Sequence, residues 1–264
     1  MTPVLMLGAG RLGGALIEGW SRFGGPAGGD LMILDPTPSE AARAAGRMGA
    51  ILSPAATDLA RVQTVLLAVK PQVWREAAAA VAGALAPDAV ILSVAAGVRA
   101  SDISEAFGGR KVARVMPTTA VAIGRGVASL FSADRGAAEC ARALFSPIAT
   151  VVDLADETLL HAATGVSGSA PAYFYAFVEA LETAGVSAGL PQEASRALAR
   201  ATMIGAAALL EASGEPPAEL RRQVTSPGGT TEAALAILMG ENGLESLLAA
   251  GVAAAARRSA ELGG

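Results

Sequence analysis

The sequence has almost none of the residues that hold metals or form covalent cross-links. Its 264 residues include one cysteine and one histidine, Cys140 and His161. A lone cysteine cannot form a disulfide within the chain or belong to a cysteine cluster that binds a metal. A single histidine excludes metal sites built from several histidines and argues against a catalytic triad that depends on one. We therefore expect no metal site.

Aromatic residues and long apolar runs are also scarce. Aromatics make up 4% of a chain that is 52% hydrophobic and rich in alanine and glycine, which favours closely packed helices. The alanine-rich run at 77–86 is too short to span a bilayer. The N-terminus leads directly into an apolar strand and a glycine loop, without the pattern of a signal peptide. A net charge of -4 and a sequence pI near 5.2 argue against nucleic acid or an anionic membrane as a partner. We expect a cytoplasmic protein.

A glycine motif opens the chain. The apolar run Val4–Leu7 is followed at once by Gly8-Ala9-Gly10-Arg11-Leu12-Gly13 and then by a helical pattern. In this context Gly8 permits a tight turn, Gly10 lets a pyrophosphate approach the backbone, and Gly13 lets helix and strand pack closely. The motif predicts a dinucleotide site. The alternative is a glycine-rich turn in an α/β fold that binds no ligand.

An acidic residue ends the second expected strand. Leu31–Leu34 is followed by Asp35, whose carboxylate could accept hydrogen bonds from the adenosine ribose and would repel a 2′-phosphate. Asp35 therefore leans toward NADH over NADPH, although Thr37 and Ser39 could still serve a phosphate. Alternatively, Asp35 simply forms a turn before Pro36.

Apolar strand patterns alternate with helical ones over the first 153 residues, which predicts a doubly wound parallel sheet of the Rossmann type. The further strands are expected at 65–69, 90–94, 112–115, 127–131 and 149–152. Ligands of such sheets bind at the carboxyl ends of the strands. Lys70 follows one strand there, and the small residues Ala95-Ala96-Gly97, which could admit a flat ring, follow the next.

Residues 154–264 show helical spacing throughout, so we expect an all-α domain for substrate binding and dimerisation. The helix expected from Pro191 to about Ser213 carries small and apolar side chains on nearly all sides. A domain of this size rarely surrounds one of its own helices so fully, which indicates that a second subunit covers it.

A corner between two helices stands out in this half, at Thr225-Ser226-Pro227-Gly228-Gly229-Thr230-Thr231. Proline and paired glycines stop one helix, and Thr230 or Thr231 is expected to cap the next. Free amides at a helix start attract anions, and the hydroxyls add donors. The corner predicts a seat for a small carboxylate; the alternative is a capped helix–loop–helix turn.

These groups suit the reduction of an imine better than that of a ketone. Hydride transfer needs mainly positioning, and a protonated imine is already electrophilic. A ketone would need a strong proton donor as the alkoxide forms, and the sequence offers no evident one.

The chain resembles pyrroline-5-carboxylate reductases over its whole length. The motifs that carry the resemblance are Gly8–Gly13, Ala68-Val69-Lys70-Pro71-Gln72, Ser93-Val94-Ala95-Ala96-Gly97-Val98, Arg114-Val115-Met116-Pro117, Thr164-Gly165-Val166-Ser167-Gly168-Ser169 and Thr225–Thr231. The resemblance implies reduction of L-1-pyrroline-5-carboxylate to L-proline with NADPH or NADH, the last step of proline biosynthesis. It also implies a homodimer formed through the C-terminal helices, often assembled further into a decamer of five dimers.

The resemblance assigns roles to individual residues. Ser226, Gly229, Thr230 and Thr231 would bind the substrate carboxylate, with Ser226 and Thr231 as the catalytic candidates and Thr231 as the partner of the ring nitrogen. Glu157 matches an acidic position that lines the substrate pocket. The cofactor contacts would be Gly8, Gly10, Arg11, Leu12, Asp35, Val69, Lys70 and Ala96. Thr118 departs from the family pattern, because an asparagine usually stands there.

Two other readings fit parts of the pattern. A β-hydroxyacid dehydrogenase would oxidise an alcohol with a lysine in its helical domain, but no lysine occurs after Lys111. A nucleotide-sensing module without turnover would need only the glycine motif, and the hydroxyl-rich corner argues against it.

Overall fold

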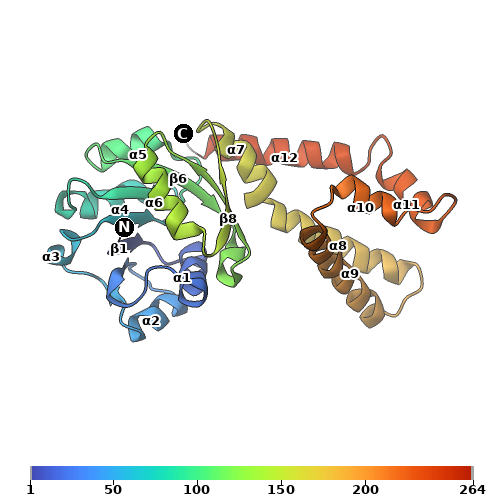
Figure 1. The fold of residues 1–264 in the computed structure, drawn as a ribbon, viewed down its shortest axis with the longest axis horizontal. Helices are drawn as coiled ribbons and strands as arrows, with labels where there is room; N and C mark the ends of the chain where they lie inside the picture. The colour runs from blue at the N-terminus through green and yellow to red at the C-terminus, as the bar shows by residue number, and fades with distance from the viewer. Residues whose placement is uncertain (1, 263–264) are drawn as a thin grey trace. The chain divides into compact units, whose positions relative to one another are not determined.

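A computed structural model describes residues 2–262 (Figure 1). Contacts between Cα atoms divide these residues into two compact units. The first unit runs to Gly168 and also includes the chain from Ala254 on, while the second unit is Ser169–Ala253. The strands end at Asp153, but the first helical turns after it still belong to the first unit. The division at 153/154 therefore stays a proposal about the two sequence modules.

The first unit is built on a mostly parallel eight-stranded sheet with strand order β3-β2-β1-β4-β5-β6-β7-β8. The strands are β1 Val4–Leu7, β2 Leu31–Leu34, β3 Ile51–Leu52, β4 Thr64–Leu67, β5 Val90–Ser93, β6 Val112–Pro117, β7 Gly126–Phe131 and β8 Ala149–Asp153. Strands β2 and β3 lie on one side of β1, and β4 and the later strands lie on the other side. This order confirms the doubly wound fold. Only the short strand β3 lies outside the predicted set.

Within the described residues, β6 and β7 are the one neighbouring pair that runs antiparallel. The connection between them contains a single 3-10 helix, η3 (Thr119–Ile123). Parallel neighbours need a crossover of a dozen residues or more. The short connection therefore forces β7 to turn back along β6.

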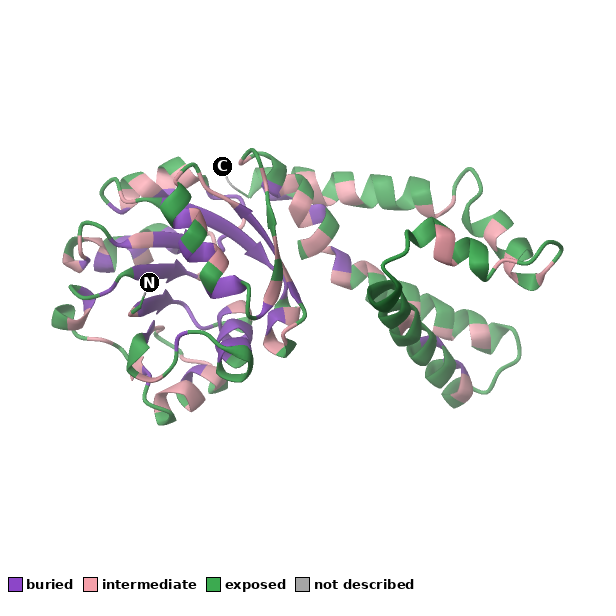
Figure 2. Ribbon diagram, in the orientation of Figure 1, coloured by how far each residue is buried: buried purple, intermediate pink, exposed green. Residues whose placement is uncertain are grey.

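Side chains alternate along each strand and bury two apolar clusters, one on each face of the sheet. On β1, Val4 and Met6 belong to one cluster, while Leu5 and Leu7 belong to the other. Figure 2 shows the inner strands as almost continuously buried, whereas the edge strands β3 and β8 are partly exposed. This explains why the inner strands are mostly apolar in sequence.

Helices cover both faces. They are α1 Arg11–Phe23, α2 Glu40–Arg47, α3 Ala56–Leu59, α4 Trp74–Val81, α5 Ala100–Ala106, α6 Arg135–Phe145 and α7 Leu159–Ala163. Residues of α1, α2 and α6 pack in the cluster with Val4 and Met6, and residues of α4 and α5 pack in the other. The Trp20 indole donates to the Leu144 carbonyl at 2.9 Å, which ties α1 to α6. The Asp134 carboxylate caps α6 as an acceptor from the Ala137 amide at 2.8 Å.

The segment Thr164–Gly168 continues α7 as a π-helical turn. The sequence pattern suggests a break here, because glycine and serine alternate. Two hydroxyls support the turn instead: Thr164 donates to the Leu160 carbonyl at 2.7 Å, and Ser167 to the Ala163 carbonyl at 2.8 Å. Side-chain donors thus satisfy carbonyls where the regular ladder changes register.

The second unit is entirely helical. It contains α8 Ala170–Ser187, α9 Gln192–Ser213, α10 Pro217–Gln223, α11 Thr230–Leu238 and the first part of α12 Leu244–Glu261. Helices α8 and α9 form a hairpin, in which the Ser195 hydroxyl donates to the Glu182 carbonyl at 2.7 Å and Arg200 pairs with the Glu182 carboxylate at 2.7 Å.

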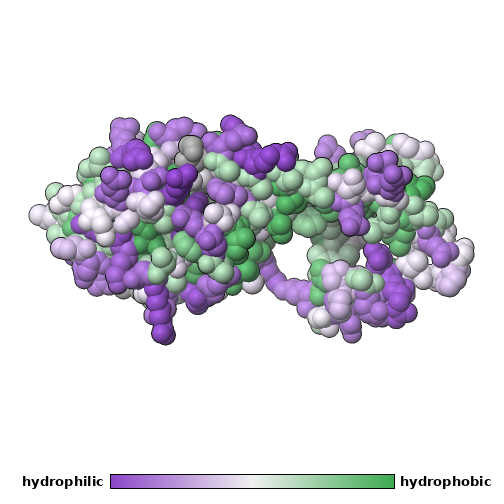
Figure 3. All heavy atoms as spheres, turned by 90° about the horizontal axis from the view of Figure 1, so that it is seen from above, coloured by the Kyte–Doolittle hydropathy of each residue, from purple (hydrophilic) through white to green (hydrophobic). Residues whose placement is uncertain are grey.

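Many large apolar side chains of this unit are exposed. Figure 2 shows its helices as mostly exposed, and Figure 3 shows hydrophobic residues (green) on its surface among hydrophilic ones (purple). Phe174 is 59% exposed, Ile204 70% and Ile237 80%. Isolated protomers rarely leave so many apolar groups in water.

None of the helices within residues 2–262 combines the length and the apolarity that crossing a membrane requires.

Candidate functional site

The glycine loop between β1 and α1 has the geometry that a dinucleotide requires. Gly8 has a φ of 90° and its amide donates to the Leu34 carbonyl at 3.0 Å. A Cβ atom at Gly13 would lie 2.6 Å from the Gly8 carbonyl oxygen, whereas one at Gly10 would meet nothing within 4 Å. Gly10 also precedes the first residue of α1. The loop therefore leaves open space at a helix N-terminus, where a phosphate fits.

The Asp35 carboxylate lies against this loop. Its Oδ2 accepts a hydrogen bond from the Ala9 amide at 2.5 Å, and its Oδ1 accepts one from the Thr37 amide at 2.7 Å. Two backbone donors thus fix the carboxylate at the end of β2, beside the glycine loop. The predicted contact with the ribose stays a prediction, but the charge lies where such a contact would be made.

The remaining predicted cofactor residues follow the carboxyl ends of neighbouring strands. Val69 and Lys70 come after β4, and Lys70 is exposed. Ala96 is half-buried in the loop between β5 and α5, next to Gly97 with a φ of 81°. Since β1, β2, β4 and β5 are parallel neighbours, these groups gather at one edge of the sheet together with Gly8, Gly10, Arg11 and Leu12.

Glu157 lies in the first unit and is bound to two partners. Its Oε1 accepts hydrogen bonds from the Ala100 amide at 2.7 Å and from Arg114 Nη1 at 2.9 Å. The Arg114 side chain is 3% exposed and that of Glu157 is 27% exposed. The predicted contact of Glu157 with substrate is not tested by this arrangement and stays a prediction.

Arg114 is a residue whose contribution the sequence reasoning missed. It interrupts the apolar pattern of β6, between Ala113 and Val115. A buried guanidinium requires a partner, so a lone arginine inside a buried strand is a signal for a nearby carboxylate. That signal could have pointed to Arg114, although it could not have identified Glu157 as the partner.

His161 lies near the same pair. Its Nδ1 is 3.1 Å from the Ser259 hydroxyl of α12. Burial lowers the pKa of His161, and the positive charge of Arg114 lowers it further, against a smaller opposing effect of Glu157. Burial and the charge of Arg114 thus both favour the neutral imidazole.

The corner before α11 differs from the prediction in its capping. Gly229, and neither Thr230 nor Thr231, is the N-cap residue, and no side chain caps the helix. The expectation that a threonine caps α11 is therefore wrong: the two threonines are the first residues of the helix. Gly228 has a φ of 70°, which a glycine adopts without strain.

Hydrogen bonds inside the corner leave part of it open. The Gly229 amide donates to the Ser226 carbonyl at 2.9 Å, and the Gly228 amide donates to Glu232 Oε2 at 2.7 Å. The first helical bond of α11 runs from the Ala233 amide to the Gly229 carbonyl at 3.2 Å. The amides of Thr230 and Thr231 precede that bond and point out of the helix start. They remain available to an anion, together with the exposed Ser226.

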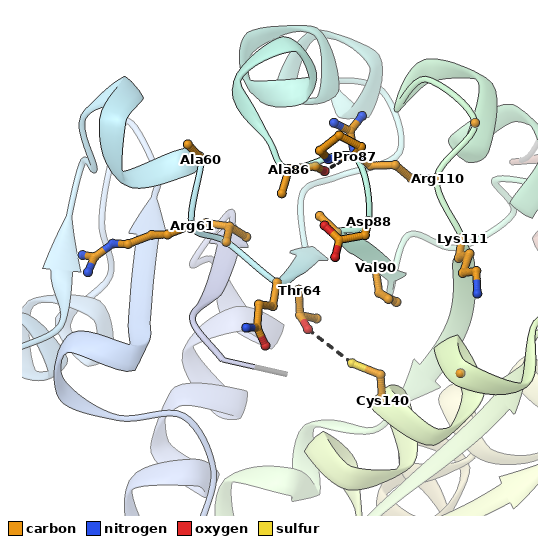
Figure 4. Close-up of a pocket in the computed structure, with 15 residues that line it drawn as sticks. Ala60, Arg61, Thr64, Ala86, Pro87, Asp88, Val90, Arg110, Lys111 and Cys140 are labelled. Atoms are coloured by element: carbon orange, nitrogen blue, oxygen red, sulfur yellow. Dashed lines mark hydrogen bonds between the residues drawn. The ribbon is translucent and has the colours of Figure 1, made fainter.

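A hollow of about 770 Å³ lies elsewhere on the first unit. It is lined by residues at the amino ends of β4, β5 and β6, among them Thr64, Val90 and Lys111 (Figure 4). Cys140 Sγ lies 3.2 Å from Thr64 Oγ1 at its base, and burial raises the pKa of this thiol. Because the glycine loop lies at the opposite edge of the sheet, the hollow is separate from the candidate site.

Two family profiles match the chain. Residues 3–97 match a family described as NADP oxidoreductase coenzyme F420-dependent, and residues 157–262 match one described as pyrroline-5-carboxylate reductase dimerisation. The two matches fall on the glycine-loop half and on the helical half.

Individual proteins resemble the chain over nearly its full length. A pyrroline-5-carboxylate reductase of Pseudomonas aeruginosa is 38% identical, over 99% of this chain and 97% of the relative. The structure of a pyrroline-5-carboxylate reductase from Coxiella burnetii has a TM-score of 0.89 at 25% identity, covering 100% of this chain and 99% of the other. That of Plasmodium falciparum pyrroline carboxylate reductase with NADP bound has a TM-score of 0.84 at 25% identity, covering 100% and 98%.

Proposed function

The chain belongs to the pyrroline-5-carboxylate reductase family, and from this premise we propose which of its groups carry the reaction. The protein is an oxidoreductase acting on a CH–NH group in proline biosynthesis: it reduces the C=N bond of L-1-pyrroline-5-carboxylate to give L-proline. The observation that carries this function is the 38% identity with a full-length relative over 99% of the chain.

The first unit fits a nicotinamide dinucleotide. The open space at Gly10, the start of α1 and the anchored Asp35 provide a phosphate seat and a ribose partner at one edge of the sheet. When bound, the reduced cofactor supplies the hydride that the imine carbon accepts. We propose that Gly8, Gly10, Arg11 and Leu12 hold the pyrophosphate, while Val69, Lys70 and Ala96 contact the rest of the molecule.

Asp35 leads us to propose a preference for NADH. Its carboxylate is held by two backbone amides and cannot swing away without losing both bonds. A 2′-phosphate beside this fixed negative charge would be repelled, whereas ribose hydroxyls would find an acceptor.

We propose that the corner before α11 binds the substrate carboxylate. The free amides of Thr230 and Thr231, the hydroxyls of Ser226 and both threonines, and the close approach that Gly229 permits all support an anion there. The Thr231 hydroxyl would hydrogen-bond the ring nitrogen, with Ser226 as a second catalytic candidate. Glu157 would line the substrate pocket through Oε2, because Oε1 already serves two donors.

The protein is a homo-oligomer, since residues 157–262 match the family's dimerisation domain. We propose a homodimer formed through the C-terminal helices, assembled further into a decamer of five dimers. The exposed apolar surfaces of α8, α9 and α11 support such a dimer. We also propose a cytoplasmic location, in keeping with a free thiol at Cys140.

Initial rates with NADH and NADPH, measured side by side with L-1-pyrroline-5-carboxylate, test these proposals. We expect loss of reduced-nicotinamide absorbance that depends on the substrate, faster with NADH at equal concentration. A control without substrate measures background oxidation. No oxidation by a protein that still binds the cofactor would overturn the assigned activity and favour a nucleotide sensor. A faster rate with NADPH would overturn the proposed preference.

A further inference from the structure

We infer that Arg114 and Glu157 are positioning residues that fix the loop between β5 and α5, the loop that carries Ala96. The inference rests on the proposed function, because that function gives Ala96 its contact with the cofactor. Neither side chain needs to touch the reacting atoms for this role.

One carboxylate oxygen joins three segments of the chain. Glu157 Oε1 accepts from the Ala100 amide, the first residue of α5, at 2.7 Å and from Arg114 Nη1 of β6 at 2.9 Å. Glu157 itself follows β8. The carboxylate therefore joins the start of α5 to the middle of β6 and to the segment that follows β8.

Burial makes the pair a fixed feature rather than a surface contact. Arg114 has 3% of its side chain exposed. On β6 it alternates with Ala113 and Val115, which pack in one apolar cluster, so it projects to the other face, where Val112 packs near α5. A guanidinium in such surroundings cannot remain unpaired, because water cannot replace its partner. Arg114 thus holds the carboxylate in place, and the carboxylate holds Ala100.

The loop that begins at Val94 is fixed at both ends by these contacts. At its start the Val94 amide donates to the Leu67 carbonyl at 3.0 Å, and the Ala95 amide donates to the Ser93 hydroxyl at 3.2 Å. At its end the Ala100 amide donates to Glu157. Between these anchors lie Ala96 and Gly97. Without the Glu157 contact, this end of the loop loses that hydrogen bond and is held by the packing of the buried Val98.

This arrangement explains how Glu157 can affect the cofactor side of the reaction. Hydride transfer depends on the distance between two carbon atoms, and a loss of fixed geometry lowers its rate steeply. A loop held less firmly at this end would let Ala96 move, and with it the part of the cofactor that Ala96 is proposed to contact. The effect should therefore appear in cofactor binding and in the hydride step, rather than in binding of the substrate carboxylate.

Two matched double variants test the role. Removing Glu157 alone would leave a buried charge and could prevent folding. Arg114→Met combined with Glu157→Gln removes both charges and keeps an oxygen that can accept from the Ala100 amide. Arg114→Met combined with Glu157→Leu removes the charges and that oxygen as well. The comparison between the two isolates the bond to Ala100.

For each double variant, the thermal midpoint, kcat, both KM values and the isotope effect with reduced cofactor deuterated at the transferred position are measured. We expect the leucine form to have a cofactor KM about tenfold above that of the glutamine form, the size expected for one lost hydrogen bond. We also expect a larger isotope effect on kcat, because the hydride step becomes slower relative to the others. A merely structural role would shift the thermal midpoint and leave the isotope effect unchanged.

Equal cofactor KM values and equal isotope effects in the two variants would overturn the inference. So would a difference confined to the KM for pyrroline-5-carboxylate, which would place Glu157 at the substrate alone. A wild-type protein without turnover would count against the proposed function and not against the positioning role of Arg114 and Glu157. In that case fluorescence titration with NADH still compares the two variants, and equal dissociation constants would overturn the inference.

Discussion

The glycine loop allows a sharp test, because two of its glycines should fail in different ways when each is replaced by alanine. Gly10→Ala and Gly13→Ala add the same methyl group three residues apart. Gly13 lies inside α1, whereas Gly10 precedes it and borders open space. We expect the first substitution to weaken cofactor binding and the second to weaken the fold.

The structure gives the size of each effect. At Gly13 the new methyl would lie 2.6 Å from the Gly8 carbonyl oxygen and 3.4 Å from the Met6 sulfur. Overpacking costs about 1–3 kcal/mol, and a contact this short with a backbone atom belongs in the upper half of that range, about 2–3 kcal/mol. The helix propensity of alanine offsets about 1 kcal/mol. The net loss of about 1–2 kcal/mol corresponds to a fall in Tm of about 2–8 °C for a protein of this size.

Gly10 should tolerate alanine in the free protein. Its φ of -67° and ψ of -152° suit any residue, and the added methyl meets no atom within 4 Å. We expect a change in stability within about 0.5 kcal/mol. The methyl would, however, occupy the approach of the pyrophosphate to the loop amides. Losing one charged hydrogen bond costs about 1.5–3 kcal/mol, which weakens cofactor binding roughly tenfold to a hundredfold.

Thermal unfolding without ligand and fluorescence titration with NADH measure the two effects separately. The wild-type chain is the reference, and each variant is the control for the other. The reasoning fails if Gly10→Ala lowers Tm as much as Gly13→Ala does. It fails equally if Gly10→Ala binds the cofactor as tightly as the wild type.

Further predictions concern the cofactor, the corner and the histidine. Asp35→Ser should raise the rate with NADPH relative to NADH, and an unchanged ratio would show that Asp35 does not read the ribose. Thr231→Ala should lower kcat by about a hundredfold or more if its hydroxyl helps to place the ring nitrogen. Gly229→Val should mainly raise the substrate KM, because its Cβ would lie 3.0 Å from the Ser226 carbonyl oxygen and would distort the proposed carboxylate site. Full activity of both Thr231→Ala and Gly229→Val would remove the corner from the mechanism. Because the folded-state pKa of His161 is lowered below 6.5, the unfolded chain binds the proton more readily, so stability should fall as pH drops below about 6.5. Unfolding curves of His161→Asn should show a weaker dependence on pH in that range.

The sheet could be predicted closely because its strands are buried on both faces. A fully buried parallel strand is an uninterrupted apolar run, as in Val4–Leu7 and Leu31–Leu34, and both runs match the observed bounds. The two-residue strand β3 lacked that signal, since Leu52 is exposed. The antiparallel β7 could not be distinguished from a parallel strand, because direction depends on the length of the connection and not on the strand itself.

The grouping of Gly8, Gly10 and Asp35 was easier to predict than the other contacts around the candidate site. Gly8, Gly10 and Asp35 follow strands directly, so the topology of the sheet brings them together. The bond between Glu157 and the Ala100 amide joins residues 57 positions apart, and no local pattern encodes such a contact. The capping of α11 was mispredicted for a different, local reason: Gly229 takes the N-cap position, and the Glu232 carboxylate accepts from the Gly228 amide.

The chemistry of this chain explains why fixed geometry matters more than acid–base groups in it. The corner before α11 offers amides and hydroxyls, and one charged side chain, that of Glu232, accepts from the Gly228 amide. A protonated imine already carries the charge that makes it electrophilic, so the protein need not provide a strong acid. What remains is to hold two carbon atoms at reacting distance, and small displacements reduce that rate by large factors. A buried ion pair that stabilises little by itself then has a reason to be present. The ion pair of Arg114 and Glu157 fixes the loop between β5 and α5, and that loop carries Ala96, which is proposed to contact the cofactor.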